Sequence, residues 1–290
     1  AGGTGFAGLS GSPMTPDDFH FLARLVRRRA GLSLGDGKSA GLEQRLMPVM
    51  RRFGFREADT LIGELRLGND TLAAAVTEAM TVNETSFFRD PRQFARLRDE
   101  LLPRLLAAHR EDRHLRIWSA ACAAGQEAWS LAMMLDAMPL HGWTVDLIAT
   151  DICGDAVGRA EAGHYSQHDV MRGLSEEDVA RHFAAQESGF LISDRLKRMV
   201  RFRKFNLMDS YGWLDGLDLV LCRNVLMHFD RAARLSVLER LAETLSPDGL
   251  LVLGDTETVQ GCADLYHELP GGSGIYAKAR AQIARLSAAI

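Results

Sequence analysis

The chain has 290 residues, of which 47% are hydrophobic and 25% charged, with a formal net charge of −4. This composition is ordinary for a globular protein, and the length predicts one large or two modest domains. No apolar run approaches the roughly 18 residues that a membrane span needs. Residues 1–13 lack the basic start and apolar core of a signal peptide, so we expect them to form a flexible tail.

The four cysteines argue against a metal site or a disulfide framework. They are widely spaced, form no C-x-x-C pair and have no histidine pair nearby: Cys122, Cys153, Cys222 and Cys262. Reduced thiols in a reducing compartment are the simplest interpretation, and we expect a cytoplasmic protein without a bound metal.

Basic residues are concentrated near the N-terminus. From His20 to Arg56, nine lysines and arginines stand against two acids, a local charge of +7 that leaves −11 for the remainder. This distribution points to an acidic partner, although basic side chains that only solvate helix faces would give the same count. RNA is a competing polyanion, but we expect no nucleic acid because few aromatic residues are interleaved with the cations.

Residues 14–82 are predicted to form a helical domain. The first helix has a cap at Thr15 or Asp17 and closes at Gly31. The second covers residues 38–52 and contains Pro48, which should kink it. Its polar face carries cations spaced seven apart: Lys38, Arg45 and Arg52. Further helices fit residues 58–67 and 70–80.

After a linking helix at 93–109, short apolar runs alternate with helical stretches. Strands are expected at 115–119, 145–150, 199–205, 217–222 and 250–254, with helices at 127–138, 154–162, 175–183 and 231–245. This alternation predicts an α/β fold with a parallel sheet. The sequence S-P-D-G at 246–249 is typical of a turn, and residues 271–280 allow one more strand.

Polar or small residues follow each predicted strand, where ligands bind in open α/β sheets. The small-residue loop at 119–125 would let a ligand approach the backbone, and Asp151 suits ribose hydroxyls. Asn206 and Leu207 follow the third strand, and Arg223 and Asn224 follow the fourth. Each feature alone fits tight packing or a helix cap. Together, without a G-x-G-x-x-G dinucleotide motif, they favour an adenosine ligand lacking a diphosphate, with S-adenosylmethionine the leading candidate.

The sequence resembles the CheR-type chemotaxis receptor methyltransferases from about Met14 to Lys278. The motifs that carry the resemblance are T-V-N-E-T-S-F-F-R-D (81–90), I-W-S-A-A-C-A-A-G-Q-E-A-W-S (117–130), A-T-D-I (149–152), N-L (206–207), C-R-N-V-L-M-H-F-D (222–230) and S-P-D-G-L-L (246–251). The resemblance implies an all-helical N-terminal domain (14–82), a linker over the cofactor (83–110) and a class I, Rossmann-like methyltransferase domain (111–290). A small antiparallel β insertion is expected at 184–205.

The resemblance also implies roles for matching residues. Asn83, Thr85 and Arg89 would lie on the linker against the cofactor, and Arg223 and Asn224 would complete the pocket.

Four further residues would hold separate parts of S-adenosylmethionine. Glu127 would bind the amino group of its methionine part, and Asp151 the ribose hydroxyls. Asn206 and Leu207 would contact the adenine. The implied substrate is a glutamate on the cytoplasmic helices of a chemoreceptor. The products are a glutamate methyl ester and S-adenosylhomocysteine.

Few acid–base groups are needed for this reaction. A glutamate carboxylate has a reference pKa of about 4.3, so it is already ionised near neutral pH. The enzyme must supply placement, close approach and exclusion of water. Arg89 is our candidate to orient the carboxylate, and the alternative for Arg89 is a salt bridge with Asp90 or another acid. The acidic receptor helices would face Lys38, Arg45, Arg51 and Arg52.

Some positions depart from the pattern of the family. His228, our second catalytic candidate, stands where the family usually has a tyrosine near the reacting methyl, and it could instead be a buried polar residue. Gln126 and Trp129 alter the loop around Glu127, and Asp255 replaces a common histidine.

Only a short turn at 188–189 marks the β insertion, so we expect no need for a C-terminal receptor tether peptide. We expect a monomer that does not insert into the membrane. Two alternatives stay open: a related methyltransferase with another protein or small-molecule substrate, and a non-catalytic cofactor-binding signalling module. A nicotinamide dehydrogenase is disfavoured because the glycine motif is missing.

Overall fold

The computed structural model describes residues 14–35 and 39–279. Contacts divide the chain into a helical unit, Ala1–Val82 with His228–Asp230, and a sheet unit, Asn83–Met227 with Arg231–Ile290. The expected tail at 1–13 and the side chain of Lys38 lie outside the described residues. Among the helices of the described ranges, none is both long and apolar enough to cross a membrane.

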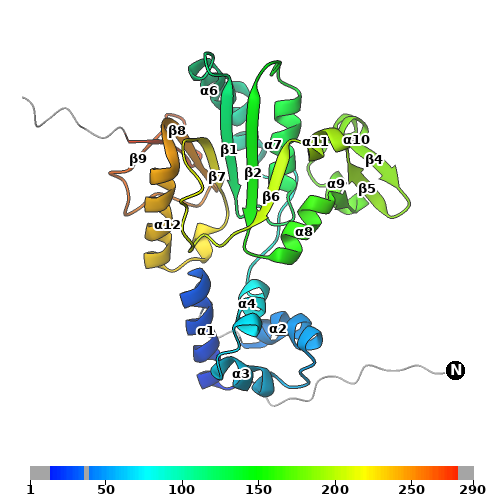
Figure 1. Ribbon diagram of the computed structural model, residues 1–290, viewed down its shortest axis with the longest axis vertical. Helices are drawn as coiled ribbons and strands as arrows, with labels where there is room; N and C mark the ends of the chain where they lie inside the picture. The colour runs from blue at the N-terminus through cyan, green and yellow to red at the C-terminus, as the bar shows by residue number, and fades with distance from the viewer. Residues whose placement is uncertain (1–13, 36–38, 280–290) are drawn as a thin grey trace, which may run out of the picture. The chain divides into compact units, whose positions relative to one another are not determined.

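The helical unit is built from helices α1 (Pro16–Ala30), α2 (Ser39–Phe53), α3 (Ala58–Arg66) and α4 (Asp70–Ala79) (Figure 1). Helix α1 begins and ends where its sequence predicts. The Thr15 side chain accepts a hydrogen bond from the Asp18 N–H, and Gly31 closes the helix in the left-handed region with φ 68°. Pro48 lies inside α2, which continues past it.

A distant segment completes the helical unit. Phe229 forms an antiparallel bridge with Leu32, and the Asp230 N–H donates to the Gly31 carbonyl at 2.9 Å. Asp230 also accepts a hydrogen bond from Arg27 Nε at 2.6 Å, across 203 positions of the chain. His228–Asp230 therefore belongs by its contacts to the helical unit, which the sequence pattern does not indicate.

The sheet unit contains a seven-stranded sheet of order β6-β2-β1-β7-β8-β10-β9 (Figure 1). Strands β6, β2, β1, β7 and β8 run parallel, and β10 is antiparallel to both β8 and β9. The order reverses on either side of β1, so the carboxyl ends of β1 and its neighbours form the switch point at which α/β sheets bind ligands. The strands are β1 (His114–Ala120), β2 (Thr144–Asp151), β6 (Val200–Lys204), β7 (Leu217–Cys222), β8 (Leu245–Leu253), β9 (Tyr266–Glu268) and β10 (Ile275–Lys278).

One predicted turn lies within a strand. Residues 246–249 belong to β8, and the ladder between β7 and β8 shifts there: Leu217 pairs with Leu245, whereas Leu219 pairs with Leu250. The S-P-D-G sequence therefore forms an irregularity in the strand, as bulged strands can accommodate a proline.

Helices cover both faces of the sheet. They are α5 (Pro91–Arg96), η1 (Leu97–Leu101), α6 (Leu102–Ala108), α7 (Gln126–Asp136), α8 (Gly154–Ala162), α9 (Gln167–Met171), α10 (Glu176–His182), α11 (Asp194–Lys197), η2 (Leu226–His228) and α12 (Arg231–Thr244). The expected single helix at 93–109 is interrupted by the π-helical turn η1. Pro103 has no N–H to donate to the carbonyl four residues earlier, which accounts for the change of hydrogen-bond pattern there.

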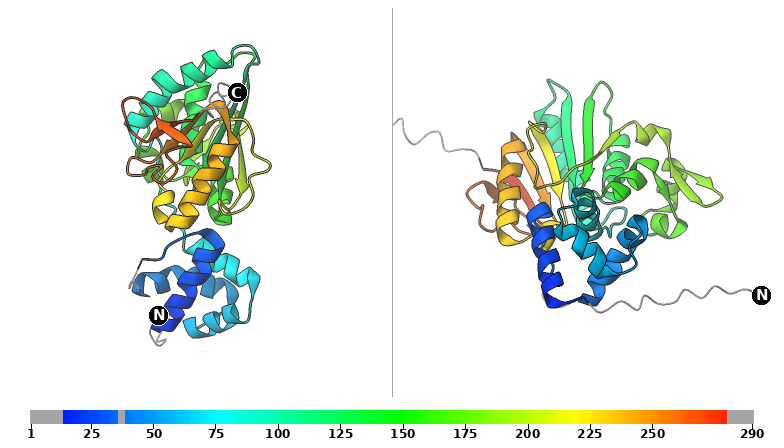
Figure 2. Two further views of the ribbon diagram at one scale, coloured as in Figure 1. Left: turned by 90° about the vertical axis from the view of Figure 1, so that its left-hand side faces the viewer. Right: turned by 60° about the horizontal axis from the view of Figure 1, so that its bottom comes forward.

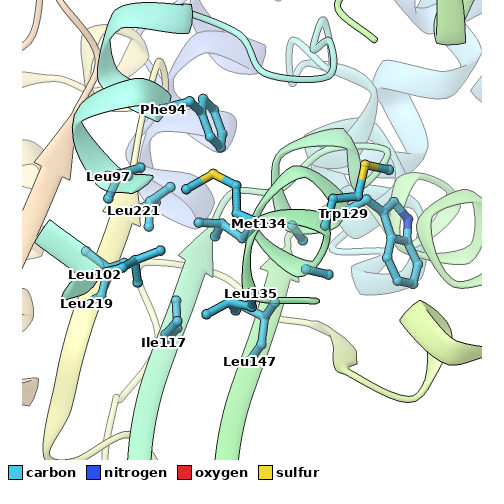
Figure 3. Packing of buried hydrophobic residues seen from close by; sticks show 14 of the residues in the cluster. Phe94, Leu97, Leu102, Ile117, Trp129, Met134, Leu135, Leu147, Leu219 and Leu221 are labelled. Atoms are coloured by element: carbon cyan, nitrogen blue, oxygen red, sulfur yellow. The ribbon is translucent and has the colours of Figure 1, made fainter. Parts of the chain in front are cut away.

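The core lies between the strands and helices α5–α7. Figure 3 shows Ile117, Leu147 and Leu219 of the strands packed with Phe94 from α5 and Leu135 from α7. The period of two in a strand sends alternate residues to the other face. Trp118 therefore points away from this cluster, and its ring lies 5.4 Å from that of Tyr211.

A separate three-stranded antiparallel sheet, β3 (His164–Tyr165), β5 (Gly189–Ile192) and β4 (Phe183–Gln186), lies beyond β6 (Figures 1 and 2). The range that we expected for the insertion, 184–205, is wrong. Its first strand comes earlier in the chain, at 164, and residues 200–204 form β6 of the main sheet. A local apolar run alone does not show which of two sheets a strand joins.

His182 links this small sheet to α7 and makes stability sensitive to acid. Burial lowers the pKa of the His182 imidazole, and the nearby carboxylates of Asp136 and Asp178 only partly offset this. The unfolded chain therefore binds the proton more readily than the folded chain, so stability falls as the pH drops below about 6.5. Urea unfolding between pH 5.5 and 7.5 should show this loss in the parent and a shallower slope in His182→Gln. The exposed His141, replaced in the same way, should leave the parent slope unchanged.

Candidate active site

The loop after β1 carries three left-handed residues at alternate positions. Ala121, Ala123 and Gly125 have φ values of 60°, 49° and 90°. The loop is tied to the end of β2, because the Cys122 N–H donates to the Thr150 carbonyl at 2.8 Å. Left-handed alanines are strained, and such strain is found where a backbone must take a set shape at a functional site.

Gly125 is required by both conformation and space. An added Cβ would lie 2.7 Å from the Ala160 Cβ, at a φ that disfavours any side chain. We expect Gly125→Ala to lower the free energy of unfolding by about 2–4 kcal/mol. Gly158 lies inside α8 with open space around it, so Gly158→Ala should raise stability by about 0.5–1 kcal/mol. Urea denaturation of both variants measures the contrast, and equal effects would contradict it.

Asp151 ends β2 beside this loop. One of its carboxylate oxygens accepts the Ala123 N–H at 2.8 Å, and the other accepts the Cys153 N–H at 2.8 Å. These two backbone bonds fix the buried carboxylate against the loop. A carboxylate at the carboxyl end of a parallel strand is the kind of group that binds ribose hydroxyls in α/β sheets.

Glu127 lies in the first turn of α7, where a carboxylate is favoured by the helix dipole. Its Oε1 accepts from Ser119 Oγ at 2.8 Å, and its Oε2 pairs with Arg223 Nη1 at 2.9 Å. The side chain is buried. Two oriented carboxylates thus lie near the carboxyl ends of neighbouring strands: Asp151 at the end of β2, and Glu127 on α7, bound to Ser119 of β1.

Arg223 is the centre of a buried polar cluster. Its side chain is 1% exposed, and Nη2 donates to Asp90 Oδ2 at 2.7 Å and to the Arg89 carbonyl at 2.8 Å. Nε donates to Gln93 Oε1 at 2.7 Å, and the guanidinium lies over the Phe94 ring. With Glu127 bound as well, this arginine holds the linker and α5 against the sheet. Its guanidinium is bound to groups of the protein, an arrangement suited to positioning those groups.

The linker that contains Asn83, Thr85 and Arg89 is anchored by its aromatic residues. The Phe88 N–H donates to Ser130 Oγ at 2.9 Å, and the Phe87 ring packs edge-on to that of Tyr165. Arg89 Nη1 donates to the Glu84 carbonyl at 3.0 Å. The salt bridge that we considered between Arg89 and Asp90 is absent from the described residues, because Asp90 pairs with Arg223.

Asn206 and Leu207 follow β6 in a loop fixed to Asp151. The Phe205 N–H donates to the Asp151 carbonyl at 2.8 Å. Asn206 Oδ1 accepts the Met208 N–H, and Leu207 is buried. These two residues therefore stand next to the end of β2, as expected of residues that contact one ligand with Asp151.

Asn224 follows β7 with φ 58°. Its backbone N–H donates to Glu257 Oε2 at 2.7 Å. Glu257 was missed by our sequence reasoning, although an acid just after the last parallel strand was a usable signal. Gln93 was also missed, and Ser119 was proposed only as part of the small-residue loop, since nothing in their local sequence indicates the side chains they contact.

The remaining predicted residues lie in the helical unit. His228 has its carbonyl hydrogen-bonded to the Ser33 N–H at 2.8 Å. Arg51 and Arg52 are exposed on α2, and Arg45 is exposed with one bond, to the Met80 carbonyl at 2.9 Å. The structure thus groups Glu127, Asp151, Asn206, Leu207 and Asn224 at the strand ends of the sheet unit.

The donor set fits S-adenosylmethionine. Two buried carboxylates suit its ammonium group and its ribose hydroxyls, and a carboxylate-lined site would repel a diphosphate. The tight loop between them is formed by small residues, so it has no bulky side chain of its own to keep a ligand from its backbone.

Comparison with known proteins identifies the same architecture. Residues 17–81 match the family description "CheR methyltransferase, all-alpha domain", and residues 83–275 match "CheR methyltransferase, SAM binding domain". The chain is 35% identical to chemotaxis protein methyltransferase 1 of Pseudomonas aeruginosa, over 91% of this chain and 98% of that protein. It is 34% identical to a chemotaxis protein methyltransferase of Vibrio parahaemolyticus and 32% to Cher2 of Pseudomonas putida, with the same two coverages. The chain therefore belongs to the CheR methyltransferase family and is an S-adenosylmethionine-dependent methyltransferase.

Proposed function

We propose that this protein transfers a methyl group from S-adenosylmethionine to glutamate side chains of chemoreceptors and acts in the cytoplasm. The observation that supports it most is the pair of buried, oriented carboxylates, Glu127 and Asp151, beside the left-handed loop. Family membership supplies the substrate class, because the matched relatives are named chemotaxis protein methyltransferases.

In this proposal each strand end holds one part of the cofactor. Glu127 takes the ammonium group, Asp151 the ribose hydroxyls, and Asn206 with Leu207 the adenine. Asn224 closes the pocket together with Asn83 and Thr85 of the linker. The cofactor supplies a methyl group activated by positively charged sulfur.

The protein's own task is placement of the acceptor. With the cofactor bound, an ionised glutamate oxygen would take the methyl group and the S–C electron pair would stay on sulfur, so no residue of the protein would have to move a proton. Arg89 orients that carboxylate with the guanidinium N–H groups that do not bind Glu84. Because Asp90 is held by Arg223, it does not compete for Arg89.

The receptor would be recognised by the helical unit. Arg51, Arg52 and Arg45 are exposed on α2 and complement acidic receptor helices. The turn between β4 and β5 spans only residues 187–188, which supports action without a tether peptide. The protein would act as a monomer.

The direct test is peptide mapping by mass spectrometry of a receptor cytoplasmic fragment after incubation with the protein and S-adenosylmethionine. A mass increase of one methylene on glutamate-containing peptides is expected. An unmodified fragment, with the cofactor consumed on another substrate, would favour the alternative methyltransferase.

His228 stands where the family usually has a tyrosine, and we propose that it takes part in the reaction. We therefore expect His228→Tyr to change the rate of methyl transfer. Initial rates at saturating cofactor, at a temperature where both proteins are folded, measure this, and equal rates would remove His228 from the reaction.

A further inference from the structure

The buried carboxylate of Glu257 binds three backbone N–H groups, two that follow the ends of neighbouring strands and one from η2. Oε2 accepts from Asn224 at 2.7 Å and from Gly254 at 2.8 Å, and Oε1 accepts from Met227 at 3.1 Å. The residue is 5% exposed. A buried carboxylate with several N–H donors is strongly held, because charge-assisted hydrogen bonds are stronger than neutral ones.

This carboxylate joins the site to the next strand. Asn224 follows β7 and Gly254 follows β8, and the last residues of these strands, Cys222 and Leu253, are partners in the parallel ladder. One side chain therefore sets the distance between the two strand ends. It also fixes both ends of the turn from Asn224 to Met227.

The turn needs such a restraint. Asn224 has φ 58°, in the left-handed region that few residues other than glycine and asparagine adopt. Gly254 leaves the space that the arrangement needs, since a Cβ there would lie 2.7 Å from Asn224 Nδ2 and 2.9 Å from Glu257 Oε2. The Asn224 side chain, the Gly254 backbone and the Glu257 carboxylate thus occupy one tightly packed corner of the site.

We propose that Glu257 is a positioning residue of the methyltransferase site, which acts through Asn224 by holding its backbone in the conformation that binds the cofactor. The inference rests on the proposed function only in taking Asn224 as a cofactor contact. If Glu257 had a purely structural role, it would stabilise the end of β8 without affecting the contact between Asn224 and the cofactor.

The substitution Glu257→Gln tests whether a carboxylate is needed at this position. It keeps the size of the side chain, but the glutamine NH2 group would face at least one of the three N–H donors. Asp255 is the matched control, because it is exposed, lies two residues away in the same turn and changes charge equally when replaced by asparagine.

The experiment is a double-mutant cycle on the binding of S-adenosylhomocysteine, measured by calorimetry on the full chain. Asn224→Gly removes the side chain and tolerates the left-handed turn. We expect Glu257→Gln and Asn224→Gly each to raise Kd by about 10–100-fold, the range for a hydrogen bond that involves charge. The double variant should be no weaker than the weaker single variant, because both changes remove the same contact. Asp255→Asn should stay within about twofold of the parent, as surface changes do.

Additive losses in the double variant, or an unchanged Kd in Glu257→Gln, would overturn the proposal even if stability falls. Should Glu257→Gln fail to fold, Glu257→Asp takes its place, with the same non-additivity required. Binding of the product needs no receptor, so this test can be read even if receptor methylation is not observed.

Discussion

Replacement of Arg223 by methionine is expected to lower the free energy of unfolding by about 3–5 kcal/mol, the range for breaking a buried ion pair by removal of one partner. The change leaves the buried carboxylate of Glu127 and the partly buried one of Asp90 without their cation, and Gln93 Oε1 without a donor. The linker would lose its tie to β7, so cofactor affinity should fall as well. Urea denaturation and calorimetry measure the two effects.

Two comparisons separate charge from geometry. Arg223→Lys keeps the charge but cannot reproduce the planar fork that binds four groups, so it should recover only part of the stability. Arg98→Met removes an exposed arginine that pairs with its neighbour Asp99, and it should change stability little. A loss in Arg223→Met no larger than in Arg98→Met would show that the buried cluster does not hold the linker.

Glu127→Gln should weaken binding of S-adenosylmethionine by about 10–100-fold, because a charged hydrogen-bonding partner of the ammonium group is lost. The same variant should bind 5′-methylthioadenosine, which lacks the ammonium group, nearly as well as the parent. Asp151→Asn, by contrast, should weaken both ligands, since both contain the ribose. Calorimetric titration of the three proteins with the two ligands gives the comparison.

The pattern across ligands decides the assignment. If Glu127→Gln weakened both ligands equally, the change would act through the loop or through Arg223 and not through the ammonium group. If Asp151→Asn affected neither ligand, the ribose would be held elsewhere.

Much of the fold follows from the sequence because its signals are local. Helix α1 is capped by Thr15 and Gly31 as predicted, and β7 covers residues 217–222 as expected. The α/β class is confirmed. The predictions that failed depend on non-local choices. The β insertion expected at 184–205 has its first strand at 164, and β8 passes through 246–249; both features depend on pairing with other strands.

The candidate site was predicted less completely for a similar reason. Asp151, Asn206 and Asn224 were proposed by a rule that needs only the positions of the strands. Glu127 lies on α7 and was proposed only through the resemblance to the family. The partners of Arg223 are distant in the sequence: Arg89 lies 134 positions away and Gln93 lies 130 positions away. Only the folded chain therefore shows that this guanidinium is already bound. Periodicity likewise cannot predict that His228 joins the helical unit.

The central claim is tested most directly by methyl transfer from radiolabelled S-adenosylmethionine to receptor-containing membranes, followed by alkali treatment. We predict that label appears on the receptor and that alkali releases it as volatile methanol, because carboxyl methyl esters are hydrolysed by base. Label that stays on the receptor after alkali, or no label although calorimetry shows that the cofactor binds, would contradict the assignment of this protein as a receptor glutamate methyltransferase.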